Sequence, residues 1–151
     1  MRLSLVIVAV LAVAACTVIP AVPTKPLAGQ TPQQEAQDER ECAEAAKSKG
    51  APSWEACMIA RRYRVAHHVV GSYGVGLEKE IDLTMHTEVT QPRTVEQVAA
   101  DIDTCRNQLR ARDTRTVGMG YAEPNRVSKL ARYYTECMEP RVYKTTLWEP
   151  K

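Results

Sequence analysis

The sequence WEACMIARRY, at residues 54–63, returns in degenerate form as YTECMEPRVY at residues 134–143. Both copies keep an aromatic residue, a Cys-Met pair, an Arg and a Tyr at the same offsets. We interpret the two segments as equivalent parts of an internal repeat. Equivalent residues of such a repeat are expected to make equivalent contacts, so the repeat guides the assignment of the rest of the chain.

The upstream halves of the two copies agree more weakly. An Asp lies four residues before a Cys in each half, Asp38 before Cys42 and Asp101 before Cys105. In an oxidising compartment four Cys form two disulfides, with three possible connectivities. A repeat implies equivalent pairing within each unit. We therefore predict two disulfides: Cys42–Cys57 and Cys105–Cys137.

Capping signals and apolar spacing predict helices around these Cys residues. The sequences at 31–34 (TPQQ) and 94–97 (TVEQ) both match the capping-box pattern. Gly50 and Pro140 are expected to end two of the helices. Each disulfide would then join two antiparallel helices in a hairpin. The expected helices cover residues 32–49, 54–65, 95–112 and 126–139.

The segment at residues 66–93 does not fit a helix. Apolar side chains alternate over residues 73–77 and again over residues 81–85, which is typical of extended strands. Three glycines between residues 71 and 76 also disfavour a helix. We expect an irregular connection or a short two-stranded ribbon, which alone would be marginally stable.

These elements predict a mainly α fold class. The chain has 151 residues, enough for one ordinary domain, and 44% of them are apolar. The predicted helical domain covers residues 31–151. It consists of two disulfide-closed antiparallel helical hairpins, at residues 31–65 and 94–143. A connector at residues 66–93 joins the hairpins, and residues 144–151 form a tail.

The first fifteen residues are typical of an export signal. Arg2 is followed by an apolar run in which only Ser4 is polar. The run ends at Ala15 and is shorter than the about 20 residues that a permanent membrane-spanning helix needs. The end of the run, Val13-Ala14-Ala15-Cys16, resembles the lipobox of bacterial lipoproteins.

That resemblance implies that residues 1–15 are a signal peptide and that Cys16 is the lipidated first residue of the mature protein. Two or three acyl chains hold a protein stably to a bilayer, whereas one does not. In enterobacterial lipoproteins an Asp after the Cys signals retention in the inner membrane. The chain has Thr17 at that place, which favours the outer membrane and an orientation toward the periplasm.

Residues 16–30 are expected to be the lipid anchor and a Pro-rich tether. Pro20, Pro23 and Pro26 recur at every third residue, which favours polyproline II. At about 3.1 Å per residue, residues 17–30 would lift a domain roughly 40 Å from the membrane.

The residues that could carry chemistry lack the spacing that chemistry requires. His67, His68 and His86 match no metal-binding motif, and the Cys residues are too far apart for a redox pair. Ser72 lies near two His residues but has no oxyanion feature or nucleophile-elbow spacing. We therefore predict no catalytic residue, no metal and no cofactor.

Basic residues form two clusters, at residues 61–64 and 106–115. The net charge is only +2, which disfavours a nucleic-acid partner. Both clusters are expected near helix C-termini, where cations are favoured, with acidic residues in the first helix to match them. Arg61 and Arg141 share one position in the repeat, so we expect each to bond carbonyls or pack within its own unit.

The repeated segment also resembles one in small exported bacterial proteins of uncharacterised type. In those proteins a helix ends in aromatic-x-x-Cys-Met-x-x-Arg/Lys-Gly-Tyr. Here Arg62 and Val142 replace the Gly. The resemblance implies export and a disulfide-closed hairpin, and it brings no activity.

Together these features predict a membrane-anchored cell-envelope lipoprotein with a non-catalytic structural or protein-binding role. The partners implied are the membrane, through the lipid, and an envelope protein. The alternative is a periplasmic binding or inhibitor module that acts on one soluble partner through residues 66–93. The sequence leaves the oligomeric state open.

Overall fold

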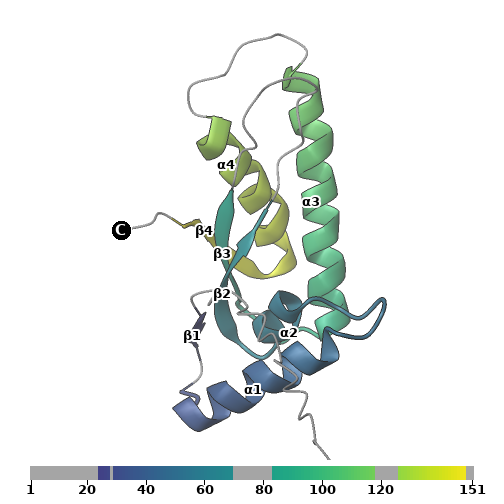
Figure 1. Ribbon diagram of the computed structural model, residues 1–151. Coiled ribbons are helices and arrows are strands. Elements are labelled where there is room, and N and C mark those ends of the chain that lie inside the picture. Colours follow the sequence, from purple (N-terminus) through teal and green to yellow (C-terminus); the bar gives the residue numbers. More distant parts are fainter. Residues whose placement is uncertain (1–23, 28, 70–82, 118–125, 149–151) are drawn as a thin grey trace, which may run out of the picture.

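The computed structural model describes residues 24–27, 29–69, 83–117 and 126–148. Its helices pack against one face of a four-stranded antiparallel sheet (Figure 1). The elements in chain order are β1 (Thr24–Pro26), α1 (Pro32–Ala45), α2 (Trp54–Ala60), β2 (Tyr63–His68), β3 (Thr84–Val89), α3 (Val95–Val117), α4 (Arg126–Met138), the 3-10 turn η1 (Glu139–Arg141) and β4 (Tyr143–Leu147).

The prediction of a mainly α fold is therefore wrong, because the fold is mixed α/β. The strand order is β1-β2-β3-β4, and every neighbouring pair is antiparallel. The predicted connector at residues 66–93 contains the second half of β2 and all of β3, and these two strands form the centre of the sheet. The alternation predicted over residues 73–77 lies outside the described residues.

The sheet shows that the repeat is longer than its Cys-Met core. Each unit runs strand, helix, helix, strand, and its two strands pair with each other. Pro26 pairs with Tyr63 in the first unit, and Val89 pairs with Tyr143 in the second. The pairing of β2 with β3 then joins the two units into one sheet.

The helix starts follow the predicted capping residues. The Thr31 and Ser53 side chains accept hydrogen bonds from the backbone N–H groups of Gln34 and Ala56, each at 3.3 Å. Thr94 and Gln97 form a reciprocal capping box with distances of 3.3 and 3.0 Å. These local signals explain why α1, α2 and α3 begin where the sequence predicts.

Both predicted disulfides are confirmed. Cys42 of α1 is bonded to Cys57 of α2, and Cys105 of α3 is bonded to Cys137 of α4. The first bridge is the main attachment of α1 to the core, because Cys42 is the one buried residue of this helix. The bridges attach the first helix of each unit to the second.

The second helix is shorter than predicted. It ends at Ala60 and not at Val65, because Arg62 adopts a left-handed conformation with φ 68° and turns the chain into β2. Val142 makes the same turn before β4, with φ 67°. Pro140 lies in η1, directly after α4, so it ends this helix as expected. The two replacements of the Gly therefore mark the junctions between helix and strand.

Part of the segment that was expected to be a tether belongs to the sheet. Residues 24–26 form strand β1 instead of polyproline II, and Leu27 donates its N–H to the Arg62 carbonyl at 3.0 Å. Pro26 is tolerated because β1 is an edge strand, where a missing N–H breaks no ladder. The folded domain therefore starts at least seven residues before the predicted boundary at residue 31.

The core lies between the sheet and the helices. Alternate residues of β2, β3 and β4 point into it, as the period of a strand requires. Tyr63, Tyr134 and Met58 are the largest of its fully buried side chains. Helix α3 packs on both α2 and α4 and covers the side of these helices that faces away from the sheet (Figure 1).

Candidate functional site

A carboxylate clamp holds the first unit together. The Tyr63 hydroxyl donates to Asp38 at 2.8 Å, and Arg61 forms an ion pair with the same carboxylate. Arg61 also contacts Glu41 at 2.7 Å. Arg61 was expected to bond carbonyls or pack within its unit. It instead joins the end of α2 to two carboxylates of α1.

The second unit repeats the clamp with Asp101. The Tyr143 hydroxyl donates to Asp101 at 2.9 Å, and the Arg141 Nε lies 3.5 Å from the other oxygen. Arg141 also donates to the Cys137 carbonyl, as expected for this position. Arg93 adds a further hydrogen bond to Asp101, at 2.5 Å. The Asp that precedes each Cys by four residues is thus the acceptor at the centre of its unit.

The tyrosines of both clamps stay protonated and serve as hydrogen-bond donors. Burial, together with the hydrogen bond to Asp101, raises the pKa of Tyr143 to about 12. Burial, with help from Asp38, also raises the pKa of Tyr63. Both hydroxyls therefore remain donors at physiological pH.

A buried polar cluster crosses the core where the two units meet. His67 of β2 is 2% exposed, and its Nε2 lies 2.9 Å from the Thr87 hydroxyl of β3. Its Nδ1 lies 3.3 Å from Arg106 of α3, and the Tyr134 hydroxyl of α4 lies 3.4 Å from Nε2. The cluster therefore joins two central strands to two helices.

The contacts assign the protonation of His67. A guanidinium can only donate, so Nδ1 accepts from Arg106 and the Nε2–H donates to Thr87. Burial, together with the nearby charge of Arg106, lowers the pKa of His67 to about 3. His67 is therefore neutral at physiological pH, and both of its ring nitrogens have partners.

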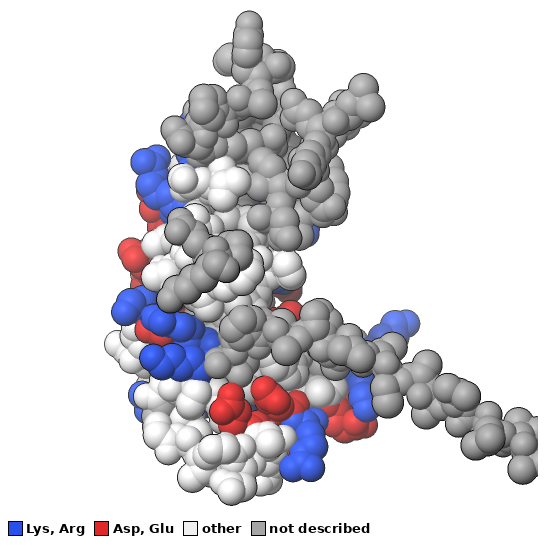
Figure 2. All heavy atoms as spheres, turned by 60° about the vertical axis from the view of Figure 1, so that its left-hand side comes forward, with Lys and Arg blue, Asp and Glu red and all other residues white. Residues whose placement is uncertain are grey.

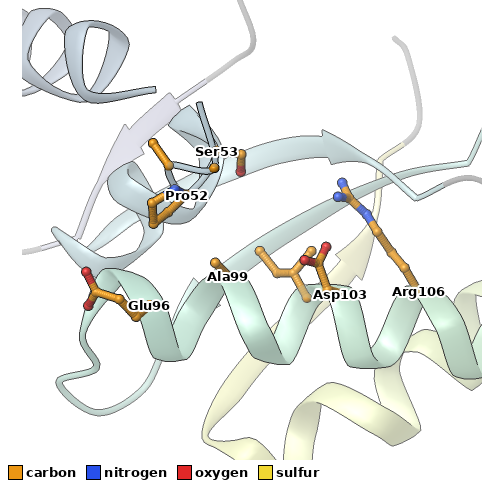
Figure 3. Close-up of a pocket in the computed structure, with 9 residues that line it drawn as sticks. Pro52, Ser53, Glu96, Ala99, Asp103 and Arg106 are labelled. Atoms are coloured by element: carbon orange, nitrogen blue, oxygen red, sulfur yellow. The ribbon is translucent and has the colours of Figure 1, made fainter. Parts of the chain in front are cut away.

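A cavity of about 460 Å³ opens next to this cluster. The turn between α1 and α2 forms one wall, and one face of α3 forms the other (Figure 3). Positions 96, 99, 103 and 106 share that face, because residues three and four apart are neighbours on a helix. The residues that line the cavity are Gly50, Ala51, Pro52, Ser53, Glu96, Ala99, Ile102, Asp103 and Arg106.

The cavity combines an apolar floor with both signs of charge. Ala99 and Ile102 supply the apolar surface, and Glu96 and Asp103 supply carboxylates. Arg106 links the cavity to the core, since its guanidinium also donates to the His68 carbonyl at 2.6 Å. Such a site can receive a mixed polar and apolar group, such as a peptide segment.

The other His residues lie on the opposite face of the sheet. His68 is exposed and lies 3.2 Å from the Thr84 hydroxyl. His86 is half-buried, and burial lowers its pKa. Across the ranges that the structure describes, no three metal-binding side chains gather. Cys16 and Ser72 lie outside those ranges.

The basic clusters are largely engaged within the fold. Arg64 contacts Glu88 at 2.7 Å, and Arg112 contacts Glu136 at 3.6 Å while it stacks on Tyr133. Figure 2 shows positive and negative side chains interspersed over one side of the molecule. Of the helices described, none is both long enough and apolar enough to cross a bilayer.

Comparison with protein-family models, curated proteins and solved structures gives no match for this chain. Sequence reasoning identified the Cys pairs and noticed the two Asp residues. It missed the cluster around His67 and the cavity, since both bring together residues that are far apart in the sequence.

Proposed function

We propose that this protein is a lipid-anchored cell-envelope lipoprotein with a non-catalytic, protein-binding role. Its compartment is supported by two structural disulfides, which form and persist in oxidising environments outside the cytoplasm. The lipobox at residues 13–16 supports the anchor, and Thr17 supports the outer membrane and a periplasmic orientation.

The position of β1 keeps the domain close to its anchor. Strand β1 starts at Thr24, eight residues after Cys16. Eight residues span at most about 28 Å when fully extended. The domain would therefore reach partners near the membrane surface, and not partners deep in the periplasm.

A non-catalytic role is supported by how the polar side chains are used. Asp38 and Asp101 each bind a Tyr and an Arg. His67 is buried and neutral, with both nitrogens engaged, so it has no free lone pair to act as a base at physiological pH.

The observation that carries the binding role is the cavity between α3 and the turn before α2. A disulfide braces each wall, because Cys42–Cys57 joins the two helices on either side of the turn and Cys105–Cys137 joins α3 to α4. Its mixture of apolar surface and charge suits a peptide segment of a partner protein. In the alternative site, residues 66–93, the described strand residues of β2 and β3 already pair with each other.

Two measurements test the proposal. The intact mass of the membrane-extracted protein, alkylated with and without reductant, should show a lipid-sized addition on a chain that begins at Cys16. Four thiols should appear only after reduction. A chain without lipid would contradict the proposed anchor. Thiols that are free before reduction would contradict the proposed oxidising compartment.

The second measurement locates the partner. A photoreactive residue at Ala99, inside the cavity, should give a discrete protein adduct in intact envelopes. The matched control places the same residue at Gln37, an exposed position on α1 outside the cavity. Equal labelling from both positions, or none from Ala99, would contradict the cavity as the binding site.

A further inference from the structure

The two edges of the sheet differ in how they are protected. Natural edge strands avoid pairing with other chains by being short or by carrying Pro and charged residues. Strand β1 has three residues, and Lys25 and Pro26 are two of them. Strand β4 has five residues, YKTTL, without Pro. Its one charge, Lys144, lies 3.8 Å from Glu88 of the same chain.

Among the described residues, nothing pairs with the backbone groups on the outer edge of β4. Val142 and Trp148 make their backbone hydrogen bonds to Thr90 and Thr84, on the β3 side. Because these bonds alternate along an antiparallel strand, Tyr143, Thr145 and Leu147 direct their N–H and C=O groups outward. Within the described part of the chain no strand lies on that side, and β4 is the margin of the sheet (Figure 1).

We propose that β4 of one chain pairs antiparallel with β4 of a second copy, with Thr145 opposite Thr145 at the two-fold axis. This register places Tyr143 opposite Leu147 of the other copy. Each of these opposed pairs can exchange two backbone hydrogen bonds, so the outward groups of all three residues become paired. The two sheets then form one continuous sheet with the helices of both copies on the same face.

The side chains on the open face favour the same register. Lys144 lies opposite Thr146 of the other copy, so no like charges meet. Val142 lies opposite Trp148, which is 36% exposed and one of the two exposed large apolar side chains of the described residues. A register centred on Lys144 would instead put two lysines directly opposite each other, which is unfavourable. A register centred on Thr146 leaves Tyr143 without a partner inside β4.

A charge placed at position 146 tests this register. The Thr146 side chain is exposed, and in the proposed dimer each of the two copies places it opposite Lys144 of the other. In the proposed dimer Thr146→Lys creates two like-charge pairs, and Thr146→Glu creates two opposite-charge pairs. We expect the dimer dissociation constant to rise about tenfold with Lys and to fall with Glu. Sedimentation of the full chain in density-matched detergent measures both. A monomer in all three proteins, or the same shift for both variants, would overturn the proposal.

Crosslinking tests the register independently of folding energies. In a mixture of the Lys144→Cys and Thr146→Cys proteins, a disulfide should link one chain of each kind, and neither variant alone should crosslink. Lys144→Cys crosslinking to itself would indicate the register centred on Lys144. Thr146→Cys crosslinking to itself would indicate the register centred on Thr146. Either self-crosslink, or no crosslink in the mixture, would overturn the pairing around Thr145.

Discussion

Arg62 and Val142 adopt the same left-handed backbone conformation, with φ angles of 68° and 67°, where each unit passes from helix to strand. Each also donates its N–H to the carbonyl three residues earlier, at 3.0 and 3.1 Å. The two junctions therefore have the same geometry although their side chains differ. A left-handed conformation is unfavourable for residues with a Cβ and is worst for a β-branched residue such as Val.

Replacing Val142 with Gly should stabilise the protein. Gly adopts a positive φ at no steric cost, so we expect Val142→Gly to raise the free energy of unfolding by about 1–2 kcal/mol. Arg62→Gly should have a smaller effect of the same sign, because Arg is not β-branched. Lys144→Gly is the matched control in an extended position and should lower stability. Urea unfolding with the disulfides intact measures all three, and a loss of stability with Val142→Gly would contradict the assigned strain.

The clamps predict two coupled residue pairs. Hydrogen bonds to charged groups contribute about 1.5–3 kcal/mol, so the double-mutant cycle of Asp101→Asn with Tyr143→Phe should show a coupling of about that size. The cycle of Asp38→Asn with Tyr63→Phe should give a similar value. Asp38→Asn with Tyr143→Phe serves as the control, because these residues belong to different clamps. Additive effects within either clamp would contradict its structural role.

The first disulfide should control the attachment of α1. Since Cys42 is the one buried residue of this helix, the pair Cys42→Ser and Cys57→Ser should leave α1 poorly held. Hydrogen exchange measured by mass spectrometry should then show loss of protection in α1 while α3 keeps its own. The matched variant, Cys105→Ser with Cys137→Ser, should spare α1. Full protection of α1 without its disulfide would mean that other contacts hold it.

The buried His67 should make stability depend on pH. Its pKa is about 3 in the folded state and about 6.5 in the unfolded state, so the unfolded state binds more protons between these values. The free energy of unfolding should therefore fall as the pH is lowered from about 6.5 toward 3. His67→Gln keeps a polar side chain but does not titrate, so its loss of stability over this range should be smaller. Parallel curves for the two proteins would show that His67 is not buried in its neutral form.

Local signals in the sequence predicted the helix starts, and the internal repeat predicted the disulfides. Thr31, Ser53 and Thr94 cap their helices through groups only three residues away. Such contacts depend little on the rest of the fold. The Cys pairing followed from the repeat, because duplicated units fold in the same way.

The strands were harder to predict than the helices. Residues 61–65 continue the apolar spacing of α2, so the sequence alone favoured a longer helix there. In the structure Tyr63 and Val65 are buried as alternate residues of β2, since the partner strand β3 supplies hydrogen bonds that a helix end cannot. Strand β1 was missed because three residues that include a Pro carry almost no strand signal by themselves. The strand forms only because it pairs with β2.

The sequence by itself determined the repeat, the helix caps and the pairing of the cysteines, because each of these depends on neighbouring residues or on a comparison within the chain. Only the tertiary structure decided the sheet, the cluster around His67 and the cavity beside Arg106. Those features join residues up to 67 positions apart, such as His67 and Tyr134. Contacts at that separation exist only after the chain has folded, so no local pattern in the sequence encodes them.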